Sequence, residues 1–131
     1  MIRILGVDPG TARIGWAVIT EDHGVLAAIA YGCITTPQKE TAECRLKLLY
    51  EEFYKIIKRQ KPDVVSVEDL FFETNAKTAI AVGQARGVIL LASAQSNITV
   101  ASYSPVTIKN TICGSGSAKK EQIGKMVQRI F

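Results

Sequence analysis

The chain begins with three short apolar runs of the kind that form β-strands. They cover residues 2–8, 14–20 and 25–35, and the first of them ends at an acid, Asp8. The second and third runs are joined across EDHG (21–24), a sequence typical of a hairpin turn. The pattern therefore predicts three antiparallel strands at the start of the chain.

After these strands, helical and strand-like segments alternate. Residues 41–60 place apolar side chains at helical spacing, and a Val-rich run that is typical of a buried strand then ends at Glu68. A strand that is reached through a helix usually returns parallel to an earlier strand and often beside it. The remaining predicted elements are a helix over 76–95, a strand over 98–102, a short helix over 105–112, and a helix from Ala118 onward with Ser117 as its N-cap.

The predicted helix at 76–95 is apolar almost all round. One stripe along it is rich in small residues and comprises Ala76, Ile80, Gly83, Gly87, Leu90 and Ala94. A helix with such a stripe and a second, bulky face is expected to be buried on both sides. Its partners would be the sheet and either a neighbouring helix or a second subunit.

Composition and charge narrow the function classes. The 131 residues suffice for one domain with a real core, and the 47% hydrophobic content is that of a globular chain. Neither a signal peptide nor a membrane span is predicted. Three cysteines without a C-x-x-C pair, and a single histidine, argue against structural zinc and favour a reducing, cytoplasmic compartment. The excess of Lys and Arg (16) over Asp and Glu (12) permits a polyanionic partner without establishing one.

Two of the twelve acids differ from the rest because each ends an apolar strand. They are Asp8 and Glu68, and in an open α/β sheet the carboxyl ends of the strands are where ligands bind. If the two strands are neighbours, their ends lie about 4.8 Å apart. Both carboxylates can then share one divalent cation, for which Mg²⁺ is the best match. Alternatively, Asp8 caps a tight turn and Glu68 begins a loop, and the two acids alone leave both interpretations open.

The sequence DPGT also matches a different class of protein. Actin-like ATPases and sugar kinases begin with a similar strand, an acid and Gly-Thr. They need two such domains with a nucleotide between them, however, and 131 residues provide only one. A Walker loop is likewise absent, because GSGSAKK does not fit G-x-x-x-x-G-K-[ST].

Two further features suit a nucleic-acid partner. Lys119 and Lys120 lie in the predicted first turn of a helix, where a basic pair beside free amides favours a phosphate group, and Lys109 lies just upstream. Ordinary surface lysines would have the same pattern. Phe71 and Phe72 follow the second strand acid closely. They either anchor a loop to the core or expose one ring that stacks on bases.

Taken in order, these residues resemble the RuvC family of crossover-junction endodeoxyribonucleases, the Holliday junction resolvases. Three stretches carry the resemblance: ILGVDPGTARIGWAVI at the start, VVSVEDLFFETNAKTAIAVGQARGVIL in the middle, and GSGSAKKEQ within residues 109–125. The middle stretch, with its strand acid, aromatic loop and Ala/Gly-rich helix, is the most specific. The resemblance covers essentially the whole chain.

The resemblance implies an α/β, RNase H-like fold, in which helices flank a mixed five-stranded sheet whose first three strands are antiparallel. It also implies a homodimer, formed through helix 76–95, that cuts four-way DNA junctions. Mg²⁺ is the implied cofactor, with two ions per site, and Mn²⁺ can substitute. The junction-binding and branch-migration proteins of the same pathway are implied partners.

By the same resemblance, Asp8 is the first catalytic acid and Glu68 the second, and both are metal ligands. The family completes its site with two further aspartates on a helix beyond the segment that aligns here, and the sequence ends at Phe131 before reaching them. We therefore expect a single nuclease domain over 1–131 that lacks its C-terminal helix. We expect this chain to fold but to cleave little or nothing by itself.

The basic residues and the aromatics also have counterparts in the family. Lys109 and Lys120 match residues that contact DNA and support catalysis, and Lys119 lies beside them. Phe71 falls at the junction-stacking aromatic, although Phe72 next to it leaves that choice open. Two other functions stay open: a junction-binding dimer without catalysis, and an RNase H-like nuclease acting on RNA, as suggested for YqgF-type relatives that share the DxG strand.

Overall fold

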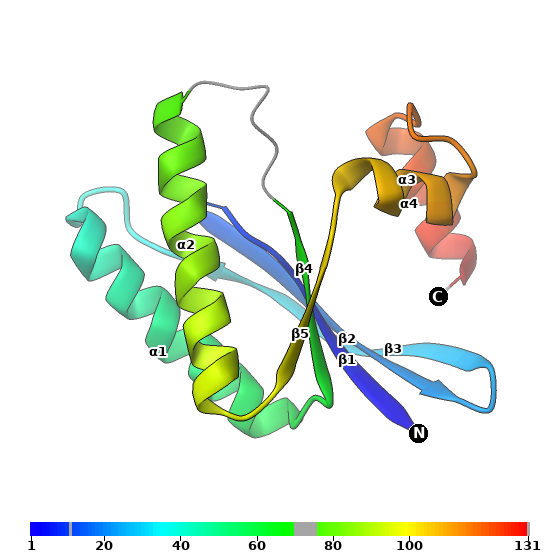
Figure 1. The fold of residues 1–131 in the computed structure, drawn as a ribbon, viewed down its shortest axis with the longest axis horizontal. Coiled ribbons are helices and arrows are strands. Elements are labelled where there is room, and N and C mark those ends of the chain that lie inside the picture. The colour runs from blue at the N-terminus through cyan, green and yellow to red at the C-terminus, as the bar shows by residue number, and fades with distance from the viewer. Residues whose placement is uncertain (11, 70–75, 131) are drawn as a thin grey trace.

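A mixed five-stranded sheet organises the residues that the computed structural model describes, 1–10, 12–69 and 76–130 (Figure 1). Its strands stand in the spatial order β3-β2-β1-β4-β5 and have the bounds β1 Ile2–Asp8, β2 Arg13–Asp22, β3 Val25–Thr35, β4 Val64–Glu68 and β5 Thr99–Tyr103. The helices are α1 Ala42–Gln60, α2 Ala76–Gln95, α3 Pro105–Cys113 and α4 Lys120–Ile130. The predicted fold class, with its mixed sheet and flanking helices, is confirmed.

The first three strands form the predicted antiparallel unit. β1 pairs antiparallel with β2, and β2 pairs antiparallel with β3. The chain reverses between β2 and β3 at His23 and Gly24, which both have positive φ (51° and 83°), as a two-residue hairpin turn requires. The carboxylate of Glu21 accepts a hydrogen bond from the backbone N–H of Gly24 at 2.6 Å and braces this turn.

The other two strands are parallel, and the register of β4 beside β1 positions the site. The N–H of Asp63 donates to the carbonyl of Arg3, and the N–H of Arg3 donates to the Asp63 carboxylate, both at 2.8 Å. From these two hydrogen bonds onward the strands keep a constant register, and Val7 lies opposite Val67. The next residue on each strand is an acid, so the register brings the two strand-end acids to the same edge of the sheet.

One face of the sheet carries the core. Figure 1 shows α1 and α2 side by side over that face, while α3 and α4 lie apart from them beyond the end of β5. The core residues come from the strands and from these two helices: Leu5, Val7, Ile14, Val18, Ile34, Leu49, Phe53, Ile56, Ile57, Val65, Val67, Ala85, Ile89 and Ala92. Side chains alternate along a strand, so the residues between the buried ones face the other side of the sheet.

The start of the last helix differs from the sequence-based expectation. The prediction that Ser117 caps a helix from Ala118 was wrong, since α4 begins at Lys120. The Ser117 hydroxyl lies 3.0 Å from the hydroxyl of Ser115 in a local turn. The N–H of Lys119 instead donates to the Gln122 side chain at 3.0 Å, which closes the start of the helix.

The small-residue stripe of α2 is open in the single chain. It was expected to be buried against a neighbouring helix or a second subunit, and without a second chain Ile80 is 64% exposed, and Ala76, Gly87 and Ala94 are exposed as well. The opposite side of α2 is buried through Ala85, Ile89, Ala92 and Ser93. One face of this helix therefore belongs to the core, and the other is open in the single chain.

Candidate functional site

Asp8 and Glu68 adjoin at the carboxyl ends of β1 and β4. The negative charge of Asp8 acts on Glu68, and the two side chains are close enough to share a proton. Burial raises the pKa of the Glu68 carboxyl above its usual value, and the charge and the hydrogen bond of Asp8 raise it further. The structure thus brings together the two acids that the sequence had singled out, at a distance where they compete for protons or share a cation.

Lys109 of α3 is the basic residue that the structure brings to this pair. Its positive charge opposes the other effects and lowers the pKa of Glu68. Lys119 and Lys120 are exposed at the start of α4, and within the described residues neither contacts Asp8 or Glu68. Of the three predicted lysines, Lys109 is the one whose charge acts on Glu68, Lys120 begins α4, and Lys119 directly precedes that helix.

The acids lie at the edge of a shallow depression on the face of the sheet that α1 and α2 leave uncovered. It is lined by the two acids and, for the most part, by small or apolar residues, among them Gly6, Gly15, Ala17, Ile19, Ser66 and Ile108. A Cβ placed on Gly15 would meet no described atom within 4 Å. The surface of the depression at Gly15, beside Asp8, is therefore unobstructed by described side chains and could admit a metal ion and a phosphate group.

The turn after Asp8 requires glycine at position 10 and leaves the Asp8 side chain at the sheet edge. A Cβ on Gly10 would lie 2.3 Å from the carbonyl oxygen of Arg13, so only glycine fits there. The carbonyl of Ala12 accepts a hydrogen bond from the N–H of Thr36 at 3.0 Å. Pro9 and Gly10 therefore serve the turn, as the sequence suggested, and the turn leaves the Asp8 side chain exposed at the sheet edge.

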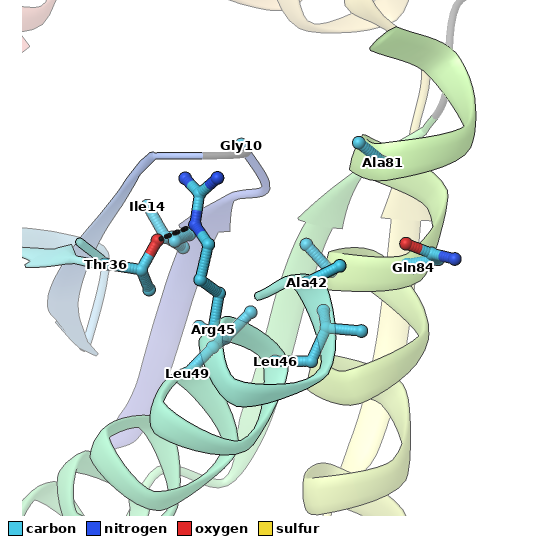
Figure 2. Close-up of a pocket in the computed structure, with 10 residues that line it drawn as sticks. Gly10, Ile14, Thr36, Ala42, Arg45, Leu46, Leu49, Ala81 and Gln84 are labelled. Atoms are coloured by element: carbon cyan, nitrogen blue, oxygen red, sulfur yellow. Dashed lines mark hydrogen bonds between the residues drawn. The ribbon is translucent and has the colours of Figure 1, made fainter. Parts of the chain in front are cut away.

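A separate small pocket lies on the other, helix-covered side of this turn. Figure 2 shows Gly10 and Ile14 on one wall, α1 below, and Ala81 and Gln84 of α2 opposite. The guanidinium of Arg45 extends toward Gly10, and its Nε donates to the Thr36 hydroxyl at 3.1 Å (Figure 2). This pocket is separate from the candidate site and does not include either acid.

Two predicted site residues cannot be placed, and one residue near the site was missed. Phe71 and Phe72 lie outside the described residues, so their stacking role stays a prediction. Arg86 is one of the few polar residues of the apolar segment 76–95 and was assigned no role from the sequence, yet it contacts Asp69, the residue after Glu68. A lone arginine among apolar residues on a buried helix was the available signal, because such a charge is costly without a partner.

Within the described residues, no group of three or more His, Cys, Asp or Glu side chains is arranged to hold a metal ion. The part of the site that the described residues form is therefore a carboxylate pair with one lysine. A sheet of this strand order, with paired acids at the adjoining ends of its first and fourth strands, defines an RNase H-like domain of the nuclease type.

Comparisons with known proteins give the particular family. The family model described as crossover junction endodeoxyribonuclease RuvC matches residues 4–131. The chain belongs to this RuvC family. The RuvC protein of Fusobacterium nucleatum is 45% identical over 130 residues, covering 99% of this chain and 68% of that protein. The RuvC protein of Moorella thermoacetica is 46% identical over 128 residues, covering 98% of this chain and 77% of that protein.

Solved structures agree with this assignment. Thermus thermophilus RuvC, solved in complex with a Holliday junction substrate, superposes with a TM-score of 0.93 at 27% identity, covering all of this chain and 80% of that one. The yeast mitochondrial Holliday junction resolvase Ydc2 shares the fold at 11% identity, with a TM-score of 0.69 over 98% of this chain and 64% of that one. Within the described ranges, no helix combines the length and the apolar character that crossing a bilayer requires.

Proposed function

We propose that the complete protein to which these residues belong acts as a structure-specific endonuclease that resolves four-way DNA junctions in recombination and repair, by hydrolysing phosphodiester bonds with symmetric nicks. The observation that carries the proposal is the Asp8–Glu68 pair at the open edge of the sheet, with Lys109 beside it. Two carboxylates at one edge of the sheet could bind a metal ion, and the positive charge of Lys109 beside them could face a phosphodiester. The T. thermophilus relative was solved with a Holliday junction substrate, which supports this choice of DNA.

The donor set fits a hard divalent cation. Asp8 and Glu68 offer carboxylate oxygens next to an open floor, and Mg²⁺ prefers one or two carboxylates together with waters and phosphate oxygens. Burial and then the charge of Asp8 raise the pKa of Glu68, and a bound cation would offset both effects. When bound, two Mg²⁺ ions would activate a water and stabilise the leaving 3′-oxygen, and Mn²⁺ would substitute.

The residues of this chain would divide the remaining work. Asp8 and Glu68 would hold the metal, and Lys109 would neutralise charge next to Glu68, while Lys119 and Lys120 would contact the DNA backbone from the start of α4. Lys120 would add charge neutralisation near the scissile phosphate. The described residues supply only two carboxylates to the site. From the family resemblance we infer that acids outside the described residues complete it and that residues 1–131 alone cleave slowly or not at all.

We further infer that two chains associate through α2. Its outer face presents Ile80 (64% exposed) and Leu91 (53% exposed), with Gly87 between them, so two such helices could approach closely. A two-fold dimer would present two equivalent sites to the two symmetric strands of a junction. Paired nicks would follow from that symmetry.

The setting of this activity is also part of the proposal. Cys33, Cys44 and Cys113 are all free thiols. Free thiols suit a reducing compartment, and we expect the protein to work in the cytoplasm. The junction-binding and branch-migration proteins of the same pathway would be its protein partners.

A cleavage assay tests the catalytic part. The 131-residue chain and a version lengthened with the C-terminal residues of the M. thermoacetica relative would be incubated with a mobile synthetic junction, a linear duplex and a structured RNA, each with Mg²⁺. We expect symmetric nicks in the junction by the lengthened version only. Asp8→Asn should abolish them and spare junction binding, whereas Asp22→Asn, the same change at the opposite end of the sheet, should not.

The outcomes of this assay separate the alternatives. Junction binding without any metal-dependent nicking would support a binding module, and preferred cleavage of RNA would support an RNA nuclease. Strong cleavage by the 131-residue chain would contradict the inference that acids are missing. Retained cleavage by Asp8→Asn would refute the metal role of that acid.

Sedimentation tests the dimer. Leu91→Arg places a charge on the outer face of α2 and should shift the chain toward monomer. Val25→Arg, at a residue 68% exposed in the β2–β3 hairpin, is the matched control and should leave the mass unchanged. An unchanged mass for Leu91→Arg, or a monomeric wild type, would contradict association through α2.

A further inference from the structure

We propose that Arg86 of α2 is a positioning residue for Glu68. By clamping the carboxyl ends of β4 and β5 from the helix-covered side, it keeps the Glu68 carboxylate beside Asp8. The inference rests on the function proposed above, in which Glu68 is a metal ligand. The role of Arg86 can be tested separately from that function, because it concerns what holds Glu68 in place.

The clamp consists of three described contacts at the end of the parallel strands. One terminal nitrogen of Arg86 donates to the Asp69 carboxylate at 3.1 Å and to the Ser102 hydroxyl at 2.8 Å. The N–H of Asp69 donates to the carbonyl of Tyr103 at 2.8 Å and so extends the β4–β5 ladder by one residue beyond Glu68. Arg86 therefore ties together β4, β5 and α2 within one residue of the acid.

The alternation of side chains makes this arrangement relevant to the site. Val65 and Val67 of β4 are buried beneath the helices, so Glu68 points to the open face and Asp69 points back toward α2. The contact that Arg86 makes with Asp69 thus fixes the backbone that carries Glu68. It does so without occupying the open face, where a metal and DNA would bind.

The residue type also points to a positioning role. The side chain of Arg86 is only 21% exposed on a helix whose inner face is otherwise apolar. Its Nε is buried and has no hydrogen-bond partner among the described residues. The ion pair with Asp69 is only partly buried, since the Asp69 side chain is 45% exposed, and such a pair contributes little net stability. An arginine here is therefore better explained by the orientation it gives to Asp69 than by core stability.

Side chains that orient metal ligands through a second contact usually matter for metal affinity. Losing such a contact typically weakens metal binding by about 10-fold to 100-fold. For Arg86 the chain of contacts runs from the guanidinium to Asp69, along one peptide unit, to Glu68. Removal of the clamp should therefore loosen the strand end and weaken a metal site on the far side of the sheet.

The test combines metal binding with hydrogen exchange on the 131-residue chain. Mn²⁺ affinity would be measured by electron paramagnetic resonance, and exchange of the Asp69 amide by NMR. Arg86→Leu should weaken Mn²⁺ binding measurably, by up to about 10-fold, because Arg86 reaches Glu68 only through Asp69 and the backbone, and it should accelerate exchange at Asp69. Arg86→Lys keeps a donor and should recover part of both. Gln84→Leu, an exposed position on the same helix, is the matched control and should change neither.

Further measurements separate positioning from a general structural effect. The thermal midpoint of Arg86→Leu should stay close to that of Gln84→Leu, because the change replaces a poorly satisfied charge with an apolar side chain. Asp69→Asn should weaken binding less when Arg86 is already leucine than in the wild type, since both act through one contact. Wild-type Mn²⁺ affinity and wild-type Asp69 exchange in Arg86→Leu would overturn the proposal.

Failure of the proposed function would look different. Equal Mn²⁺ binding by the wild type and Glu68→Gln would remove the metal role of Glu68. In that case the clamp would be decided by exchange alone: faster exchange at Asp69 in Arg86→Leu would support it, and an unchanged rate would overturn it.

Discussion

The sheet with α1 and α2 differs from the arm, residues 105–130 with α3 and α4, in how it is held. α1 alone buries Leu49, Phe53, Ile56 and Ile57. Neither α3 nor α4 has a buried residue, and in the described arm only Ala118, between the two helices, is buried. Regions with few buried apolar contacts open more easily than the core of the same protein. The two parts therefore differ in local stability.

The division of the candidate site follows this difference. Asp8 and Glu68 stand on central strands of the well-packed part, whereas Lys109, Lys119 and Lys120 all belong to the arm or to its loop. Metal geometry requires ligands held to a fraction of an ångström. Contacts to DNA phosphates are long-range and tolerate movement. The well-packed part thus carries the carboxylates, whose positions must be precise. The arm carries the lysines, whose contacts with phosphates tolerate movement.

The largest expected effect contrasts the two parts by core truncation. Phe53→Ala removes a fully buried ring beneath the sheet and should destabilise the chain by about 3–5 kcal/mol. Ile123→Ala in α4 removes a partly buried side chain and should cost about 1 kcal/mol or less. Urea unfolding followed by circular dichroism measures both. Equal losses for the two variants would show that the arm is packed as firmly as the core.

Hydrogen exchange should show the same contrast without a substitution. Amides of β1 and β4 should exchange only through global unfolding, whereas amides of α3 and α4 should exchange through local opening. Their protection factors should therefore differ by orders of magnitude under native conditions. Addition of junction DNA should slow exchange in the arm more than in the strands. Uniform protection across the chain would contradict the comparison.

Most of the fold could be predicted because its patterns are local. Residues 25–35 and 76–95 were predicted with the bounds that the structure gives, and β4 ends at Glu68 as expected. The start of α4 was misplaced by two residues because Ser117, a good N-cap by type, bonds within its own turn to Ser115. Local preference named a suitable cap there, and the three-dimensional turn decided otherwise.

The site was predictable only where it follows from strand register. Asp8 and Glu68 could be paired because each ends a strand and the strands were expected to be parallel neighbours, which they are. Arg86 could not be assigned, because its contact with Asp69 joins a helix to a strand end 17 residues away. The position of Lys109 near Glu68 also could not be predicted from the residues alone, since it depends on how α3 turns after β5.

A lysine substitution sharpens the comparison at a smaller scale. Lys109→Met should weaken junction binding several-fold and reduce the slope of log affinity against log salt by about one, as expected when one phosphate contact is lost. Lys47→Met, on α1 and 77% exposed, is the control and should change neither. Fluorescence anisotropy over a salt series measures both. An unchanged slope for Lys109→Met would place that side chain away from the phosphates.

The smallest expected effect concerns the contribution of the raised Glu68 pKa, caused by burial and by Asp8, to the stability of the fold. The pKa of Glu68 is raised in the folded chain, so the folded state holds that proton more tightly than the unfolded state does. Stability is then full below the unfolded pKa and falls as pH rises through the folded pKa. Glu68→Gln removes this loss, and it should therefore raise the thermal midpoint slightly at neutral pH and have no such effect in acid.

Lys109 connects this effect to the arm. Because its charge lowers the pKa of Glu68, the gain from Glu68→Gln at neutral pH should be larger when Lys109 is methionine. Mg²⁺ should narrow the difference between wild type and Glu68→Gln, since it binds the two carboxylates and offsets their repulsion. Thermal melts at several pH values, with and without Mg²⁺, measure all three quantities. If the gain were the same with and without Lys109, the arm would exert no electrostatic control over the acids.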